Sequence, residues 1–146
     1  MTKTILLVED NASDEKLTLV AFKKSNIDNE IVIVRDGAEA LDYLLGKAES
    51  APVATLPTLV LLDLNLPRVS GLDVLRRLRA EERTKLLPIV ILTASKEEED
   101  LINGYSLGAN AYVRKPVDFL QFAEAARTLG LFWQLRDEPA APSVRR

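Results

Sequence analysis

The sequence predicts an α/β fold in which helices cover both faces of a parallel β-sheet. Short apolar runs alternate five times with longer helical patterns, and this alternation is typical of consecutive βα units. The run from Leu59 to Leu62 is apolar at every position, as in strands that are buried on both faces. The connections between parallel strands are expected to be right-handed crossovers.

Each expected element is marked by its residue pattern, and several boundaries carry a further signal. Strands are expected at 4–9, 30–35, 58–63, 88–93 and 110–114, and helices at 12–25, 37–46, 70–82, 97–108 and 118–134. Asp36-Gly37 precedes the second helix, as is typical of a helix start. Ser70 and Asp73 have the spacing of a capping box at the third helix, and Gly108 is expected to end the fourth.

Length and composition indicate one globular domain. The 146 residues are 47% hydrophobic and 28% charged, which suits one core in a chain too short for two ordinary domains. We expect this domain to span residues 1–135. Residues 136–146 are polar and are expected to form a flexible tail, while 46–57 form the one long internal loop.

The composition argues against several kinds of function. The net charge of −3 disfavours nonspecific nucleic-acid binding, and no second segment remains for a DNA-binding domain. The chain has no Cys and no His, which excludes disulfides, thiolate zinc sites and histidine general bases. No run approaches the roughly 18 apolar residues of a membrane span, and no signal peptide precedes the first strand, so we expect a cytoplasmic protein without a membrane partner.

Polar and ionisable residues stand where four of the expected strands end. They are Glu9 and Asp10 after Ile5–Val8, Asp63 after Leu59–Leu62, Thr93 after Ile89–Leu92, and Lys115 after Ala111–Arg114. The carboxyl ends of parallel strands meet at one edge of the sheet, where α/β proteins bind ligands. Three acids, a hydroxyl and an ammonium at this edge therefore predict a phosphoryl-transfer site with a metal.

The chemistry of these groups suggests a role for each. Carboxylates at neighbouring strand ends repel one another unless a cation neutralises them, and Mg²⁺ suits such a site. Asp63 is the expected nucleophile, because a carboxylate that attacks phosphorus forms an aspartyl phosphate. Thr93 and Lys115 would contact the phosphoryl oxygens. The expected rim of the site consists of Asn65, Ala94 and Ser95.

Each site residue also has an ordinary structural explanation. Asp10, Asn11 or Ser13 can cap the following helix. Thr93 can be a β-branched strand residue, and Lys115 can be a solvated surface charge. The X-Pro bond that follows Lys115 can be cis, which would hold the lysine at an unusual angle.

Taken together, these residues resemble the receiver domain of two-component response regulators. The matching pattern covers residues 3–134 and consists of Glu9-Asp10, Asp63, Thr93-Ala94, Tyr112 and Lys115-Pro116. The resemblance implies a flavodoxin-like (βα)5 doubly wound sheet with strand order 2-1-3-4-5. It also implies that Thr93 and Lys115 hold phosphoryl oxygens, and that Tyr112 turns inward as Thr93 moves toward them.

The same resemblance implies a phosphoryl donor and a set of metal ligands. Asp63 would accept a phosphoryl group from a phosphohistidine on a partner histidine kinase. Asp10, Asp63 and the backbone carbonyl of Asn65 would ligate Mg²⁺, with Glu9 acting through water.

A narrower resemblance is to single-domain regulators that serve phytochrome-type photoreceptor kinases. Its features are Val8-Glu9-Asp10, Leu62–Pro67, the loop 46–57 and Phe132-Trp133. This resemblance implies a kinase of the bacteriophytochrome type. The signal would then leave through the surface of the receiver to an unidentified downstream protein.

The last helix is the expected contact surface. Its core-facing stripe consists of Phe119, Phe122, Ala123, Ala126, Gly130 and Trp133. Further apolar residues lie off this stripe, so we expect a homodimer with Phe132 and Trp133 at or near the contact. The alternative is a helix end that folds back over its own core.

The expected function is that of a phosphoacceptor signalling protein, which is not an enzyme apart from slow self-dephosphorylation. Three other functions are alternatives to it. A phosphatase of the haloacid dehalogenase type would need a second Asp where this chain has Asn65. A flavin-binding electron carrier would need a Gly- and hydroxyl-rich loop where the chain has Glu9-Asp10-Asn11-Ala12. A receiver-like scaffold that is never phosphorylated is disfavoured by the intact set of site residues.

Overall fold

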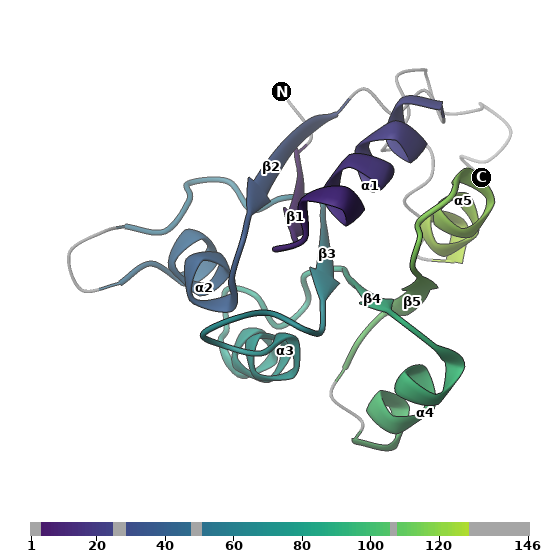
Figure 1. Cartoon of the computed structure of the whole chain (residues 1–146). Helices are drawn as coiled ribbons and strands as arrows, with labels where there is room; N and C mark the ends of the chain where they lie inside the picture. The colour runs from purple at the N-terminus through teal and green to yellow at the C-terminus, as the bar shows by residue number, and fades with distance from the viewer. Residues whose placement is uncertain (1–3, 25–28, 48–50, 106–107, 129–146) are drawn as a thin grey trace, which may run out of the picture.

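Five parallel strands form one sheet in the order β2-β1-β3-β4-β5, with a helix after each strand (Figure 1). The computed structural model describes residues 4–24, 29–47, 51–105 and 108–128. The strands are β1 (Thr4–Val8), β2 (Glu30–Val34), β3 (Leu59–Asp63), β4 (Ile89–Thr93) and β5 (Ala111–Arg114). The helices are α1 (Ala12–Lys24), α2 (Gly37–Leu45), α3 (Gly71–Ala80), α4 (Lys96–Tyr105) and α5 (Phe119–Thr128). The predicted fold class and strand order are confirmed.

Strand burial explains why this sheet is parallel and central. Every residue of β3 and β4 is buried, as expected for strands that helices cover on both sides. Alternate residues of each strand enter two separate cores. One core lies under α1 and α5, where the rings of Phe22 and Phe122 pack with centroids 4.7 Å apart. The other core lies under α2 and α3, and includes Leu44, Leu75 and Leu78.

The helix boundaries agree with most of the predicted signals. Asp36 caps α2 by accepting a hydrogen bond from the Glu39 N–H at 2.7 Å. Ser70 caps α3 in the same way, but the Asp73 carboxylate of the expected capping box pairs with Arg76 instead. The predicted helix end at Gly108 follows two residues that lie outside the described ranges, and Gly108 itself has a positive φ of 89°.

Most predicted boundaries differ from the observed ones by one or two residues, and some predictions extend beyond the described residues. The helix expected at 97–108 begins one residue earlier, at Lys96. The helix expected at 118–134 is described from Phe119 to Thr128, and the remainder of that prediction lies outside the described residues, as does the expected tail 136–146. Among the described residues, no helix is both long enough and apolar enough to cross a bilayer.

The loop after β3 is shaped by a close approach of two backbones. A Cβ on Gly71 would lie 2.3 Å from the carbonyl oxygen of Asp63, so only glycine fits at the start of α3. The Gly71 N–H donates to the Leu64 carbonyl at 2.9 Å, and Arg68 turns the loop with φ of 70°. This packing holds the end of β3, and with it Asp63, at a fixed place on the carboxyl edge.

Candidate functional site

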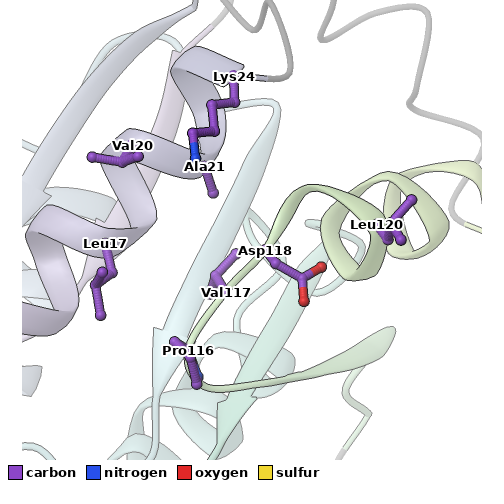
Figure 2. A pocket seen from close by; sticks show the side chains of 8 residues that line it. All are labelled: Leu17, Val20, Ala21, Lys24, Pro116, Val117, Asp118 and Leu120. Carbon is purple, nitrogen blue, oxygen red and sulfur yellow. The ribbon is translucent and has the colours of Figure 1, made fainter.

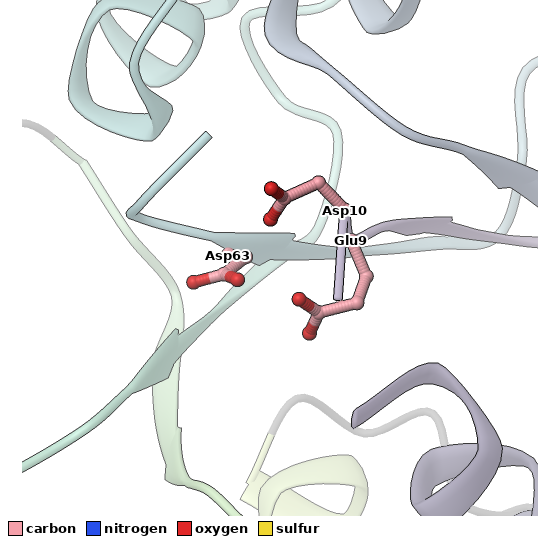
Figure 3. A group of neighbouring side chains, drawn as sticks. All are labelled: Glu9, Asp10 and Asp63. Carbon is pink, nitrogen blue, oxygen red and sulfur yellow. The ribbon is translucent and has the colours of Figure 1, made fainter. Parts of the chain in front are cut away.

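The three predicted acids meet at the carboxyl edge of the sheet. β1 pairs with β3 so that Val8 lies beside Leu62, which brings the residues that follow them together. Oxygen atoms from Glu9, Asp10 and Asp63 all lie within 4.8 Å of one another (Figure 3). Glu9 and Asp63 are buried, whereas Asp10 is exposed. The site is therefore an acidic pair set into the protein with a third carboxylate at the surface.

Lys115 completes this cluster from the last strand. Its backbone N–H donates to the Thr93 carbonyl at 2.8 Å, which fixes it beside the end of β4. Its Nζ lies 2.9 Å from Asp63 Oδ2, 3.0 Å from Asp14 Oδ2 and 3.6 Å from Glu9 Oε1. The Lys115–Pro116 peptide bond is cis, as the sequence allowed. The ammonium therefore lies among three carboxylates.

The burial of Glu9 changes its acidity. Burial, together with a hydrogen bond to Asp63 and the charge of Asp63, raises the pKa of Glu9 to about 8. Lys115 opposes this shift through its positive charge, without cancelling it. In the absence of a cation, Glu9 is therefore largely protonated at neutral pH.

The acidity of Lys115 shifts in favour of the charged ammonium. Burial alone would lower the pKa of Lys115. The hydrogen bonds to Asp63 and Asp14, with the charges of Asp63 and Glu9, outweigh burial and raise this pKa above its ordinary value. The site therefore holds a permanent positive charge next to the Asp63 carboxylate.

Two buried oxygen atoms at this edge have no hydrogen bond within the described part of the chain. They are Oγ1 of Thr93 and Oε1 of Glu9, although Lys115 Nζ lies at 3.6 Å from the latter. Buried polar atoms without partners are uncommon, and each one calls for an explanation. A ligand that offers an acceptor to the Thr93 hydroxyl and a cation to Glu9 would satisfy both.

These donors fit a hard divalent cation. The available ligands are carboxylate oxygens, which suit Mg²⁺ and related ions, and the sequence contains no thiol or imidazole to compete with them. A divalent ion would neutralise the crowded acids, and its charge would stabilise the Glu9 oxygen that has no hydrogen bond to a described residue. The residues present therefore fit the metal that the sequence predicted.

The rim residues take parts that the sequence did not predict. The Asn65 N–H donates to Asp63 Oδ1 at 3.2 Å, and Asn65 is exposed. Ser95 Oγ accepts the Glu98 N–H at 3.1 Å, so Ser95 caps α4. The Ala94 N–H donates to Glu98 Oε1 at 2.7 Å. Asn65 thus contacts the central carboxylate, while Ser95 and Ala94 form a cap with Glu98.

The remaining predicted residues are Tyr112 and the aromatic pair of the last helix. Tyr112 is half-buried on β5 and packs against the core under α2 and α3. Phe132 and Trp133 lie outside the described residues. The helix cap near the acids is Asn11, whose Oδ1 accepts the Asp14 N–H at 2.9 Å. This answers the alternative raised for Asp10, since the side chain that caps α1 is that of the next residue.

The sequence did not single out Asp14, which belongs to the cluster through Lys115. An acid in the first turn of a helix is ordinary, because it interacts favourably with the helix dipole. Its position one turn after Asp10 was the available signal. Only the register between α1 and the end of β5 reveals the ion pair.

An apolar groove opens beside the cluster, between α1 and the start of α5. Figure 2 shows its lining, and its volume is about 460 Å³. Leu17 and Val20 of α1 line the groove, as do Pro116, which follows the site lysine, and Leu120. The lining of this groove is therefore mainly apolar, with Lys24 and Asp118 as its charged members.

Comparison with known proteins identifies the class of this fold and site. The response regulator receiver domain family matches residues 5–127 of the chain. The chain belongs to this family, whose members act in two-component signal transduction. The family assignment agrees with the acidic cluster, the buried hydroxyl and the lysine at the carboxyl edge.

Several similar proteins are response regulators, and two of those described below carry phytochrome in their names. The response regulator Rcp1 of Synechocystis is 38% identical over 133 residues, which cover 90% of this chain and 88% of Rcp1. The solved structure of the bacteriophytochrome response regulator RtBRR is 48% identical with a TM-score of 0.86, and the match covers 99% of this chain and 88% of that one. The phosphorylated cyanobacterial phytochrome response regulator RcpA is 38% identical with a TM-score of 0.72, covering 92% and 95%.

One of these relatives has been solved with a divalent ion. The structure of the Mn²⁺-bound form of Rcp1 is 36% identical with a TM-score of 0.69, covering 95% of this chain and 99% of that chain. The predicted family is confirmed. The predicted resemblance to phytochrome-associated regulators is also confirmed, because the matches extend over nearly the whole chain.

Proposed function

We propose that Asp63 is the phosphoacceptor of this response regulator. The observation that carries the proposal is the buried Asp63 carboxylate, 2.9 Å from the Lys115 ammonium and within 4.8 Å of oxygens from Glu9 and Asp10. One Asp63 oxygen attacks the phosphorus of a phosphohistidine on the partner kinase. The O–P bond forms as the N–P bond breaks, and the departing imidazole nitrogen takes up a proton.

The neighbouring groups fit the charge that develops in this transfer. The Thr93 hydroxyl and the Lys115 ammonium donate to phosphoryl oxygens, which gives a partner to the Thr93 hydroxyl that has none among the described residues. Glu9, Asp10 and Asp63 would hold Mg²⁺, together with the backbone carbonyl of Asn65 that the family resemblance implies. When bound, the ion neutralises the acids and the incoming phosphoryl oxygens. Tyr112 then turns inward as Thr93 moves toward the phosphoryl group.

The outcome of this chemistry is a changed protein surface rather than a released product. The chain has Asn65 two residues after Asp63, where an aspartate-nucleophile phosphatase uses an acid to complete turnover. Without that acid the aspartyl phosphate is lost only by slow self-dephosphorylation. The domain is therefore a phosphorylation-controlled switch and not an enzyme that turns over substrate.

The partner kinase is of the bacteriophytochrome type. The support is the similarity to the bacteriophytochrome response regulator RtBRR and the cyanobacterial phytochrome response regulator RcpA, which extends over nearly the whole chain. Phosphotransfer from a purified bacteriophytochrome kinase, compared with transfer from an unrelated sensor kinase, tests this assignment. Equal rates from both donors would contradict it.

Substitution of Asp63 by Asn tests the phosphoacceptor. Asn is nearly isosteric and cannot act as the nucleophile, so labelling by acetyl phosphate with Mg²⁺ is expected to disappear while the fold persists. Intact mass reports the label, and circular dichroism reports the fold. Asp42→Asn is the matched control, because Asp42 is a surface acid on α2 that pairs with Lys47. Labelling of Asp63→Asn at the wild-type level would place the phosphoacceptor elsewhere.

We further propose a homodimer through the last helix, with Phe132 and Trp133 in the contact. The support is an apolar excess that begins at Leu120, which is 75% exposed on α5, and continues in the sequence to residue 135. Burial of one large aromatic contributes about 1.5–3 kcal/mol, so the double change to serine should weaken dimerisation about tenfold or more.

Sedimentation of the wild type and of Phe132→Ser/Trp133→Ser measures this effect. Leu86→Ser is the control, because Leu86 is an 86% exposed apolar residue outside the last helix. Monomeric wild type at high micromolar concentration would contradict the dimer and favour a helix end folded over its own core.

A further inference from the structure

The Lys115 ammonium is shared between carboxylates on two different elements. Asp63 Oδ2, at the end of β3, lies 2.9 Å from Nζ, and Asp14 Oδ2, in the first turn of α1, lies 3.0 Å from it. The Asp63 side chain is 3% exposed and the Asp14 side chain 29% exposed. Asp14 therefore holds the ammonium from the solvent side, where a phosphoryl donor has to arrive.

We propose that Asp14 is a positioning residue that holds the Lys115 ammonium at the mouth of the site for the incoming phosphoryl group. The inference rests on the proposed function, because it assigns Asp14 a part in phosphorylation of Asp63. Asp14 acts only through Lys115 and is not a metal ligand.

A lysine needs such a partner because its side chain is flexible. The ammonium sits on a four-carbon stem and carries three N–H donors. Two donors are fixed by Asp63 and Asp14 at normal hydrogen-bond distances. The third faces Glu9 Oε1 at 3.6 Å, which is longer than a hydrogen bond, so it is available to a phosphoryl oxygen.

Phosphorylation makes the outer partner more important. When Asp63 becomes an acyl phosphate, its carboxylate loses its own charge and its hold on the ammonium weakens. Asp14 is unchanged by the reaction, so it keeps Nζ near the strand end while the ammonium turns toward the phosphoryl oxygens. Without Asp14, Lys115 is held mainly by the buried Asp63 and lies over the nucleophile.

Two alternative roles of Asp14 predict different results for its substitution. As an acid at the start of α1, Asp14 could contribute only to helix stability, as Glu15 in the same turn also does. As a negative charge near the site, it could only repel an anionic donor, so its removal would speed up phosphorylation. A positioning role predicts a slower reaction that depends on Lys115.

The test measures the rate of Asp63 phosphorylation by acetyl phosphate at saturating Mg²⁺. We expect Asp14→Ala to be about tenfold slower, equivalent to about 1.4 kcal/mol in the barrier. Asp14→Asn keeps an acceptor oxygen for Nζ and is expected to lose less, about threefold. The Mg²⁺ affinity of both variants should equal that of the wild type. Glu15→Gln removes the same charge from the same helical turn and should leave the rate unchanged.

A double variant of Asp14 and Lys115 distinguishes a positioning role, which acts through Lys115, from an effect of Asp14 on the rate that does not depend on Lys115. In a Lys115→Ala background, Asp14→Ala should cause no further loss of rate, because its partner is already gone. An equal loss in both backgrounds, or an Asp14→Ala protein as fast as the wild type or faster, would overturn the inference while leaving Asp63 as the phosphoacceptor. Absence of label on Asp63 in the wild type would instead overturn the proposed function and this inference together.

Discussion

At the amino edge of the sheet one guanidinium donates hydrogen bonds to four acceptors, whereas at the carboxyl edge two buried oxygens have no hydrogen bond to the part of the chain that the structure describes. The Arg79 guanidinium, at the end of α3, donates to the carbonyls of Thr84, Leu87 and Gly108 and to Asn110 Oδ1, over 2.7–3.2 Å. At the carboxyl edge, Thr93 Oγ1 and Glu9 Oε1 are buried without a hydrogen bond to any described residue.

The comparison indicates that the amino edge contributes to stability, whereas the carboxyl edge is arranged for ligand binding. The Arg79 cluster ties α3 to the starts of β4 and β5, and its polar groups are satisfied within the chain. The acidic cluster brings carboxyl groups together and leaves the Thr93 hydroxyl without a partner among the described residues, which costs stability unless a cation and an anion are bound. We therefore expect substitutions at the two edges to affect stability in opposite directions.

The largest expected effect is at the amino edge. Arg79→Ala would leave several carbonyl acceptors without a charged donor, so the free energy of unfolding should fall by about 4 kcal/mol. Urea denaturation measures the loss. Arg76→Ala on the same helix removes only an exposed pair with Asp73 and should cost less than about 1 kcal/mol. Equal losses in the two variants would mean that the Arg79 hydrogen bonds contribute little.

At the carboxyl edge, Glu9→Gln should stabilise the metal-free protein at neutral pH. The pKa of Glu9 is raised from 4.5 to about 8 in the folded state, so the folded state binds this proton more tightly than the unfolded state does. The wild type therefore loses stability as the pH rises from 4.5 toward 8, and the loss is complete above 8. At pH 7 the difference should be about 3 kcal/mol in favour of Glu9→Gln.

Thermal or urea unfolding across this pH range, with a chelator present, measures the Glu9 effect. The difference between Glu9→Gln and the wild type should vanish at about pH 4. Saturating Mg²⁺ should stabilise the wild type more than Glu9→Gln, because the ion replaces the proton on Glu9. A wild type whose stability does not change between pH 4.5 and 8 would contradict this account.

The smallest expected effect on the free energy of unfolding is at two buried threonines, which also form the most closely matched pair. Thr84 and Thr93 are both 0% exposed, but Thr84 Oγ1 donates to the Leu78 carbonyl at 2.6 Å, and Thr93 Oγ1 has no partner among the described residues. Thr84→Val should cost about 1–2 kcal/mol, whereas Thr93→Val should be neutral or slightly stabilising.

The same two threonine variants should reverse their order in ligand binding. Thr93→Val removes the hydroxyl that is available to a phosphoryl oxygen, so it should weaken Mg²⁺-dependent binding of beryllofluoride. Thr84→Val should bind it as the wild type does. If both variants bind equally well, the unpaired hydroxyl of Thr93 does not serve the phosphoryl site.

Much of the fold could be predicted from the sequence, because a strand that is buried on both faces is a continuous run of apolar residues. The apolar run Leu59–Leu62 predicted a strand covered on both faces, and helix caps such as Asp36 use side chains next to the helix that they start. The boundaries were less certain, as the early start of α4 at Lys96 shows, because the end of a helix depends on neighbours as well as on propensity.

By itself, the sequence determined that Glu9, Asp10, Asp63, Thr93 and Lys115 share one edge, because parallel strands bring their carboxyl ends together. Only the tertiary structure decided which of these groups are satisfied. It placed Asp14 on Lys115 across 101 residues, left the Thr93 hydroxyl without a hydrogen bond among the described residues, and joined Ser95 and Ala94 to Glu98 in a helix cap. Hydrogen bonds and ion pairs between distant elements form only where the distance between the atoms is right to within a few tenths of an ångström. The order of residue types along the chain does not specify distances that closely.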